Sequence, residues 1–270
     1  MSDYPYSMSL FEDIIVAALD IAGVRSIVEI GADYGGMSGV LAEYARTKGD
    51  RLISIDPAVH PAFLEWLARN PDVRHVAEPS LAALRDLPAA DAYVVDGDHN
   101  WFTVYNELTL IRAQVRADGR PLFVLLHDVG WPCARRDFYY APEQIPEAFR
   151  HPFSRTDGAV PGWPMLVPGH GLNGGDVLAM ATREGGPMNG VLTAVEDFIE
   201  SAAGEGDDLC YAHVPGALGL GVIFDAAAPW ASTMSDHLVP YHNNRLLIAL
   251  EENRLKNFID ALQAERALAA

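Results

Sequence analysis

The chain has few cysteines, few basic residues and no long apolar run. Only Cys133 and Cys210 occur among its 270 residues. A disulfide framework or a thiolate metal site, which needs clustered cysteines, is therefore not expected. Lysine and arginine number 19 against 37 aspartates and glutamates, so the net charge is −18. A chain this acidic lacks the basic surface by which proteins bind nucleic acids or anionic membranes, and we expect neither partner.

The N-terminal segment also lacks the features of a signal peptide or a membrane span. Its apolar run covers residues 14–22 only, with Glu12 and Asp13 before it and Asp20 within it. A secretory signal begins with a basic region, and a membrane span needs about 18 or more apolar residues. We therefore expect an N-terminal helix in a cytoplasmic protein.

The first half of the chain does contain a regular alternation of apolar strands and helices. Continuous apolar strands separated by helices are typical of a parallel sheet covered on both faces. The prediction is one α/β domain over residues 1–270, with a Rossmann-like, doubly wound, mostly parallel sheet. The predicted strands are 26–30, 51–55, 73–77, 92–95 and 122–126, and the predicted helices between them are 37–47, 61–70 and 101–115.

This regular pattern stops after the fifth strand. Residues 130–186 are rich in glycine, proline and aromatic residues, and a stretch this long without regular structure is commonly functional. Aromatic residues such as Tyr139, Tyr140 and Trp163 argue for a folded lid over the substrate rather than disorder. Within the lid, the adjacent residues Arg135 and Arg136 either bind an anionic group of the substrate or pair with acids such as Asp137 and Glu143.

Residues 187–270 are expected to complete the sheet and to end in a long helix. The regular pattern returns with a helix at 191–203, an apolar strand at 218–224 and a final helix at 244–268. The final helix either packs on its own domain or reaches a second subunit, so a homo-oligomer is one hypothesis.

The first strand leads into a glycine-containing turn, VEIGADYGG, which places Glu29, Gly31 and Gly35 before a helix. Glycines at such a turn let a ligand approach the backbone, and the helix N-terminus offers free N–H groups. The dinucleotide motif G-x-G-x-x-G is not present, because Asp33 occupies the position of its second glycine. A carboxylate there would repel a pyrophosphate. Asp56, at the end of the second strand, is placed to accept hydrogen bonds from ribose hydroxyls.

Over residues 26–128 this arrangement resembles the class I S-adenosylmethionine-dependent methyltransferases. In that family the turn passes under the methionine part of the cofactor, and the acid after the second strand holds the ribose. The resemblance implies the following S-adenosylmethionine-binding residues: Glu29, Gly31, Tyr34, Gly35, Asp56 and Asp98.

Acidic residues and histidines follow the fourth and fifth strands. Asp96, Asp98 and His99 come after the fourth strand, and His127 and Asp128 after the fifth. Ligands of a doubly wound sheet bind outside the carboxyl ends of its strands, so these side chains are expected at the same edge as the glycine-containing turn. Carboxylates that converge in a low-dielectric cleft repel each other, and a divalent cation would relieve that repulsion. Carboxylate oxygens suit magnesium, whereas histidine-richer sites suit zinc or iron.

These pairs resemble the metal-dependent O-methyltransferases of sugars and natural products, in the group of macrocin O-methyltransferase and the cephalosporin-hydroxylase-like proteins. The resemblance implies Asp96, Asp128 and His127 as ligands of Mg²⁺ or another divalent cation, with Asp98 as a further candidate. His127 departs from the catechol-type enzymes, which carry an acid there. The cation would lower the pKa of the substrate hydroxyl, and His99 or His127 would act as the catalytic base.

The sequence therefore predicts an S-adenosylmethionine-dependent O-methyltransferase that acts on a small hydroxylated acceptor such as a sugar or secondary metabolite. One alternative is a nicotinamide-dependent oxidoreductase, which the missing second glycine disfavours. The other is a catalytically silent, methyltransferase-like binding protein, which the intact Asp56, Asp96 and Asp128 disfavour.

Overall fold

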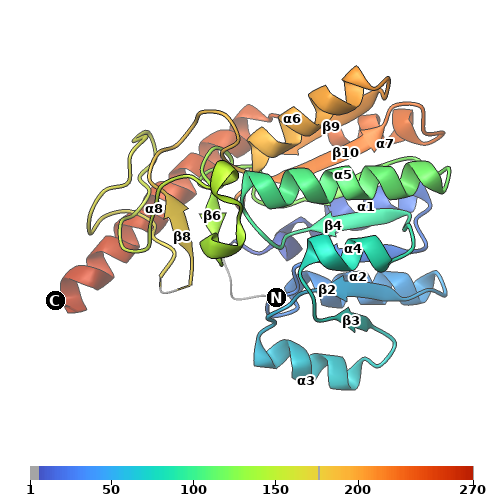
Figure 1. Ribbon diagram of the computed structural model, residues 1–270, viewed down its shortest axis with the longest axis horizontal. Helices are drawn as coiled ribbons and strands as arrows, with labels where there is room; N and C mark the ends of the chain where they lie inside the picture. The colour runs from blue at the N-terminus through green and yellow to red at the C-terminus, as the bar shows by residue number, and fades with distance from the viewer. Residues whose placement is uncertain (1–5, 176, 270) are drawn as a thin grey trace.

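The computed structural model describes residues 6–175 and 177–269, and it is built on one seven-stranded sheet (Figure 1). The strand order is β3-β2-β1-β4-β5-β10-β9. Strands β1 to β5 pair in parallel, and β10 is antiparallel to both of its neighbours. The predicted Rossmann-like, mostly parallel sheet is thus confirmed. The strands are β1 (Ile27–Ile30), β2 (Leu52–Ile55), β3 (Arg74–Val76), β4 (Ala92–Val95), β5 (Phe123–Leu126), β9 (Leu209–Val214) and β10 (Leu220–Asp225).

Helices cover both faces of this sheet, as the continuous apolar strands predict. Every residue of β1, β4 and β5 is buried. One apolar core forms under α4 (Ser80–Asp86), α5 (Trp101–Ala117) and α6 (Val191–Gly204). The other forms under α1 (Glu12–Ala22), α2 (Gly36–Thr47) and α7 (Ala231–Leu238). The 3-10 turn η1 (Met8–Phe11) precedes α1, and α3 (Pro61–Arg69) lies beside β3 at the edge of the sheet (Figure 1).

The C-terminal helix α8 (Arg245–Ala269) matches the predicted helix at 244–268. Leu255 and Ile259 are buried, whereas Leu246 and Leu250 are exposed, so the apolar stripe of the helix packs on its own domain only in part. Among the described residues, no helix has the length and apolar character that crossing a membrane requires.

Outside the lid, two helices and one strand were not anticipated from the sequence: α4, α7 and β9. Helices α4 and α7 have seven and eight residues, which is too short for a helical period to stand out. Strand β9 forms the outer edge of the sheet, and most of its residues are only partly buried. An edge strand of mixed polarity gives a weaker pattern than a central one.

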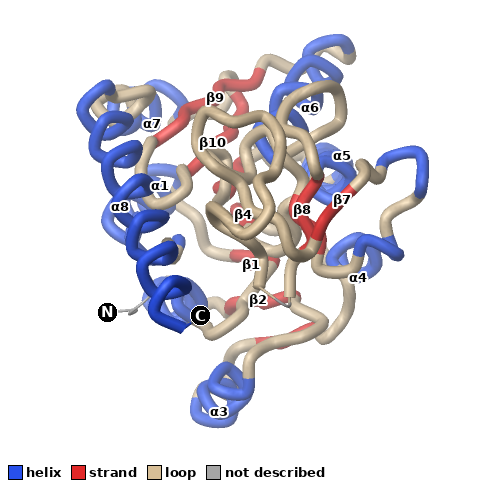
Figure 2. Tube along the Cα trace, turned by 90° about the vertical axis from the view of Figure 1, so that its left-hand side faces the viewer, coloured by secondary structure: helices blue, strands red, loops and turns tan. Residues whose placement is uncertain are grey.

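The predicted lid, residues 130–186, folds over the carboxyl ends of the parallel strands, where its loops lie in front of β1, β4 and β10 (Figure 2). Its residue 176, like residues 1–5 and 270 of the predicted domain, lies outside the described residues. The lid contains a small antiparallel sheet of order β6-β8-β7. Its elements are β6 (Phe138–Tyr139), η2 (Pro142–Gln144), η3 (Glu147–Phe149), β7 (Phe153–Ser154) and β8 (Ala179–Ala181).

A buried carboxylate anchors the lid to the rest of the domain. Asp137 is 0% exposed. Its Oδ1 accepts hydrogen bonds from the N–H groups of Trp101 and Gly190, both at 2.7 Å. Its Oδ2 accepts a hydrogen bond from the Tyr139 hydroxyl at 2.8 Å. Asp137 therefore joins the start of α5, the lid and the residue before α6.

The two lid arginines serve the fold as well. Arg135 forms a two-pronged ion pair with Glu196, at 2.5 and 2.7 Å. Arg136 is 0% exposed, donates a hydrogen bond to the carbonyl of Pro164 at 3.0 Å, and lies 3.6 Å from Glu184. Of the two predicted roles, ion pairing is the one found, but the partners are more distant in sequence than the neighbouring acids that we considered.

We predict that Asp137→Ala destabilises the protein by at least about 3 kcal/mol, because it leaves three buried donors without an acceptor. Urea unfolding measures the loss, and hydrogen exchange would locate it in the lid and at the start of α5. Glu143→Ala, an exposed change in the same lid, is the control and should stay within about 0.5 kcal/mol of the wild type. Equal stability of the two variants would contradict the anchoring role.

Candidate active site

The strand pairing continues past the strand ends and sets two functional residues side by side. The N–H of Asp96 donates to the carbonyl of Ile30 at 2.8 Å, and the N–H of His127 donates to the carbonyl of Val95 at 3.0 Å. The residues that follow β1, β4 and β5 are thereby aligned at one edge, as predicted for the carboxyl ends of parallel strands.

At this edge, Asp96, His99, His127 and Asp128 form one cluster. His127 Nδ1 lies 3.1 Å from Asp96 Oδ1 and 3.3 Å from Asp128 Oδ2. His99 Nε2 lies 3.0 Å from Asp128 Oδ2 and 3.9 Å from Asp96 Oδ1. The side chains of His127 and Asp128 are 4% and 6% exposed, whereas that of Asp96 is 26% exposed. The cluster is thus mostly buried and opens to solvent at Asp96.

The contacts of His127 define the protons on its ring. Its Nε2 lies 2.8 Å from the carbonyl oxygen of Ala217, which can only accept, so Nε2 carries a hydrogen. Its Nδ1 faces two carboxylates, which also accept when ionised. Burial lowers the pKa of His127, but Asp96 and Asp128 outweigh that effect and raise it well above its ordinary value. His127 is therefore an imidazolium in this arrangement.

The same balance applies to the other members of the cluster. Burial lowers the pKa of His99, but Asp128 and Asp96 raise it to about 10. Burial also opposes the charge on Asp128, yet His99 and His127 hold the pKa of that carboxyl well below its usual range. Two imidazolium groups thus balance two carboxylates, and this pairing permits four ionisable side chains to lie together.

The donor atoms of the cluster fit a divalent cation. Donor atoms of Asp96, His127 and Asp128 lie within 4.8 Å of one another, and so do those of His99, Asp128 and Cys133. His99 Nε2 is buried and has no hydrogen-bond partner of good geometry. The Nε2–H of His127 is held by a backbone carbonyl, as is usual for a histidine that binds a metal through its other nitrogen.

Two further features of the cluster could not be read from the sequence. Asp128 has φ = 60°, a left-handed backbone that is unusual for a non-glycine residue and often found at functional sites. Cys133 lies beside His99 and Asp128, although the spacing of the two cysteines gave no reason to expect a thiolate site. Burial and the nearby Asp128 raise the pKa of its thiol well above the ordinary value, so Cys133 is a neutral neighbour in this structure.

The glycine-containing turn lies directly against this cluster. Gly31 has φ = +90°, and a Cβ atom on it would lie 2.2 Å from the carbonyl oxygen of Asp96. Only glycine allows the turn to approach the end of β4 so closely. Gly35, with φ = +84°, caps the start of α2. The ligand that we predict at this turn would therefore be a neighbour of Asp96.

The carboxylate of Asp56 closes the turn. Its Oδ2 accepts hydrogen bonds from the N–H groups of Ala32 at 2.9 Å and Asp33 at 3.1 Å. Its Oδ1 accepts one from Ala58 at 2.8 Å. Asp56 is thus at the predicted place, held by backbone groups. Its bond to a ribose stays a prediction.

Glu29 lies beneath the turn rather than facing a ligand. It is 1% exposed, and its Oε2 accepts hydrogen bonds from the hydroxyls of Ser38 at 2.7 Å and Ser54 at 2.6 Å. Burial raises the pKa of Glu29 to about 7, against the opposing effect of the two serines. The prediction of direct contact between Glu29 and a cofactor does not fit this burial, and Glu29 instead supports the turn from below.

Three more side chains surround the turn and the cluster. Tyr34 is 41% exposed and stacks on His60, with ring centroids 3.8 Å apart. Asp98 accepts a hydrogen bond from the Thr103 hydroxyl at 2.8 Å. Tyr140 of the lid is 48% exposed, and its ring centroid is 5.9 Å from that of His99. Tyr140 is therefore the lid residue placed at the open side of the cluster.

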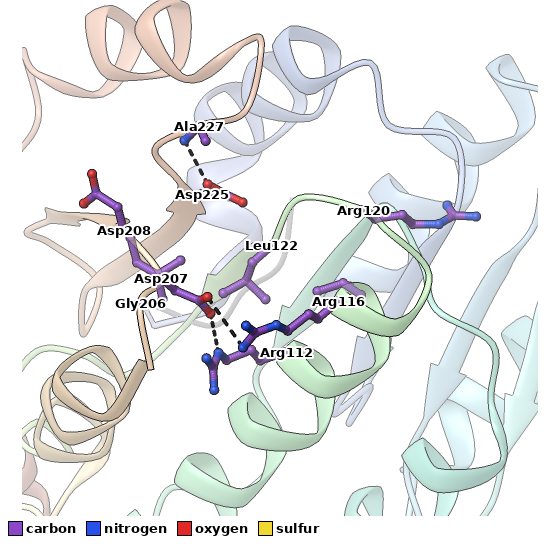
Figure 3. Close-up of a pocket in the computed structure, with 11 residues that line it drawn as sticks. Arg112, Arg116, Arg120, Leu122, Gly206, Asp207, Asp208, Asp225 and Ala227 are labelled. Atoms are coloured by element: carbon purple, nitrogen blue, oxygen red, sulfur yellow. Dashed lines mark hydrogen bonds and ion pairs between the residues drawn. The ribbon is translucent and has the colours of Figure 1, made fainter. Parts of the chain in front are cut away.

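A separate cavity of about 300 Å³ lies at the opposite end of the strands, beside Leu122 and Asp225 (Figure 3). Three arginines and three aspartates line it, the arginines being Arg112, Arg116 and Arg120. Arg112 pairs with Asp207 at 2.5 Å. The opposite charges cancel, so this cavity has no net charge that would attract an ion, and it is remote from the cluster at Asp96.

We predict that Glu29→Gln stabilises the protein more as the pH rises. The pKa of Glu29 rises from 4.5 to about 7 on folding, so ionisation of the wild type costs stability over that range, up to roughly 3 kcal/mol at pH 8. Glutamine keeps an acceptor for both serine hydroxyls and does not titrate. Thermal melts from pH 5 to pH 8 test this, with the exposed Glu65→Gln as control. A difference in melting temperature between wild type and Glu29→Gln that stays constant with pH would refute the raised pKa of Glu29.

Known structures of similar shape are methyltransferases of low sequence identity. One is a methyltransferase of Podospora anserina bound to S-adenosylhomocysteine, at 16% identity and TM-score 0.48, covering 80% of this chain and 78% of that chain. Another is an O-methyltransferase of Streptomyces achromogenes involved in tomaymycin synthesis, in complex with S-adenosylmethionine, at 16% identity and TM-score 0.48, covering 81% and 80%. An O-methyltransferase of Bacillus cereus, at 12% identity and TM-score 0.49, covers 83% and 84%.

The sequence itself gives one family match. No curated protein matches the chain. Residues 28–129 match the family model of a methyltransferase domain. The matched segment runs from β1 to just past Asp128 and includes the glycine-containing turn, Asp56 and Asp96. Over these residues the chain is similar to a methyltransferase domain, which agrees with the predicted enzyme class.

Proposed function

We propose that the protein is an S-adenosylmethionine-dependent O-methyltransferase for a small hydroxylated acceptor, such as a sugar or another secondary metabolite, and that a divalent cation assists it. The observation that carries the proposal is the contact between the two halves of the site. The glycine-containing turn approaches the end of β4 so closely that a Cβ on Gly31 would lie 2.2 Å from the Asp96 carbonyl oxygen. A cofactor on the turn and an acceptor beside Asp96 would thus be neighbours.

S-adenosylmethionine, when bound, supplies an electrophilic methyl group on a positively charged sulfur. The chain offers that charge an acidic surrounding. Asp33 lies on the turn, where partial loss of solvent and the charges of Asp56 and Asp96 raise its pKa. Such mutual repulsion among carboxylates is relieved by a cationic ligand. It would disfavour a pyrophosphate, which argues against the nicotinamide alternative.

For the cation, we propose Asp96, His127 and Asp128 as ligands, whose donor atoms lie within 4.8 Å of one another. Magnesium prefers oxygen ligands and retains several waters, whereas a mixed set of imidazoles and carboxylates suits zinc, iron or manganese. His127 adds an imidazole to the two carboxylates, so the donor set favours an ion of the second kind over Mg²⁺.

We assign the catalytic base to His99 rather than His127, because His127 is occupied on Nε2 by the Ala217 carbonyl oxygen at 2.8 Å. Asp128 and Asp96 hold a proton on His99 by raising its pKa to about 10. Once a cation balances these two carboxylates, His99 can release that proton. It can then accept the proton of the acceptor hydroxyl.

We predict that S-adenosylmethionine binds the purified protein, that NAD does not, and that Asp56→Ala weakens the binding at least about tenfold. Loss of one charge-assisted hydrogen bond has this size. Calorimetric titration measures all three, and the exposed Asp50→Ala is the control, with thermal melts to show that each variant is folded. Binding of NAD in place of S-adenosylmethionine would support the oxidoreductase. Binding of neither would support the catalytically silent protein.

We also predict that Mn²⁺ or Zn²⁺ binds more tightly than Mg²⁺, and that Asp96→Ala lowers the affinity by at least about tenfold, because it removes a charged ligand. Equilibrium dialysis of the three ions against wild type, Asp96→Ala and the exposed Asp86→Ala tests this. The proposed role of the cation is refuted if an acceptor is methylated at full rate in excess chelator and Asp96→Ala is equally active.

A further inference from the structure

The turn that leads into β10 has an unusual backbone. Its four residues all have positive φ angles: 112° at Gly216, 41° at Ala217, 68° at Leu218 and 89° at Gly219. Glycine adopts this conformation freely, but two successive non-glycine residues rarely do. Such a backbone persists only where its surroundings hold it in place.

A carboxylate of the C-terminal helix holds this turn. Glu251 Oε2 accepts a hydrogen bond from the N–H of Ala217, and its Oε1 accepts one from the N–H of Leu218, both at 3.1 Å. Arg254, one helical turn along α8, donates from Nε and Nη2 to the same carboxylate, both at 2.6 Å. The side chain of Glu251 is only 13% exposed. Glu251, itself held by Arg254, therefore binds both N–H groups of the strained backbone.

This turn also contacts the segment after β5 at two points. The carbonyl oxygen of Ala217 lies 2.8 Å from His127 Nε2. The carbonyl oxygen of Leu218 accepts a hydrogen bond from the N–H of Gly130 at 2.6 Å. A Cβ on Gly130 would lie 2.5 Å from that same oxygen, so the two backbones are in close contact at Gly130.

We propose that Glu251 is a positioning residue for His127. By holding the strained turn, it fixes the carbonyl of Ala217, which binds the Nε2–H of His127 and so orients its ring. Nδ1 then faces Asp96 and Asp128. The docking of α8 itself rests on other contacts, among them Leu255 and Ile259, which are 5% and 8% exposed. Glu251 therefore acts on the cluster without being needed to attach the helix.

The first test uses Co²⁺ as a probe, since its visible absorption reports on imidazole and carboxylate ligands. It rests on the proposed cation site. We expect Glu251→Ala to weaken Co²⁺ binding about tenfold or more and to alter the spectrum, as the loss of a group that orients a ligand does. Glu251→Gln keeps one acceptor oxygen and should give an intermediate affinity. The adjacent, exposed Glu252→Ala should bind Co²⁺ like the wild type.

The second test needs no metal. Hydrogen exchange of the Gly130 amide reports whether the turn stays docked, because that amide donates to Leu218. We expect faster exchange at Gly130 in Glu251→Ala, with exchange in the central strands unchanged. If Glu251→Ala does not fold, Arg254→Ala, which leaves the carboxylate in place but unsupported, serves in the same two measurements.

The two tests separate the two hypotheses. A wild type that does not bind Co²⁺ would contradict the proposed cation, whereas the exchange of Gly130 would still decide whether Glu251 holds the turn. Wild-type Co²⁺ affinity and wild-type Gly130 exchange in Glu251→Ala would overturn the positioning role.

Discussion

The parallel pairing of β1, β4 and β5 is the constraint on which the site depends. Val95 pairs with Leu126 at the last position of their two strands, so the next residues, Asp96 and His127, must emerge side by side. Parallel strands end at one edge of the sheet, so the polar residues that follow β4 and β5 lie together there. This placement is electrostatically unfavourable, because carboxylates in a buried cleft repel each other. The histidines of the cluster supply the opposite charge in this structure, and a bound cation would replace it.

This constraint explains why much of the site could be predicted from the sequence. The apolar strands are short and bounded by polar residues, so the ends of β4 and β5 were located, and with them the convergence of Asp96 and His127. The direction of the Glu29 side chain could not be predicted, because the family resemblance names a residue type only. Glu29 faces α2, where it accepts a hydrogen bond from Ser38. The carbonyl of Ala217 could not have been found, since it acts through its backbone 90 residues after His127 and any residue type carries that group.

The distribution of positive charge bears on the proposed acceptor. Arg135 and Arg136 follow the cluster closely in sequence, but Arg135 pairs with Glu196 of α6 and Arg136 lies beside Glu184 of the lid. The open side of the cluster is instead formed by acidic residues and by the partly exposed Tyr140. An acceptor with a phosphate or carboxylate would have neither of these two arginines to pair with. A neutral hydroxylated ring, which can stack on tyrosine, fits these surroundings better and is the acceptor class that we propose.

The C-terminal helix makes polar contacts with two separate parts of the site. Leu246 and Leu250 of α8 remain exposed, whereas Leu255 and Ile259 are buried, so only part of the helix packs through apolar contacts. Its polar contacts occur at two separated places: Glu251 holds the turn behind His127, and Arg266 donates to the carbonyl of Gly171 and to Asn173 in the lid. Fifteen residues of α-helix between these contacts span about 22 Å. A rigid helix of that length fixes the lid relative to the cluster that it covers, which two independent loops could not do.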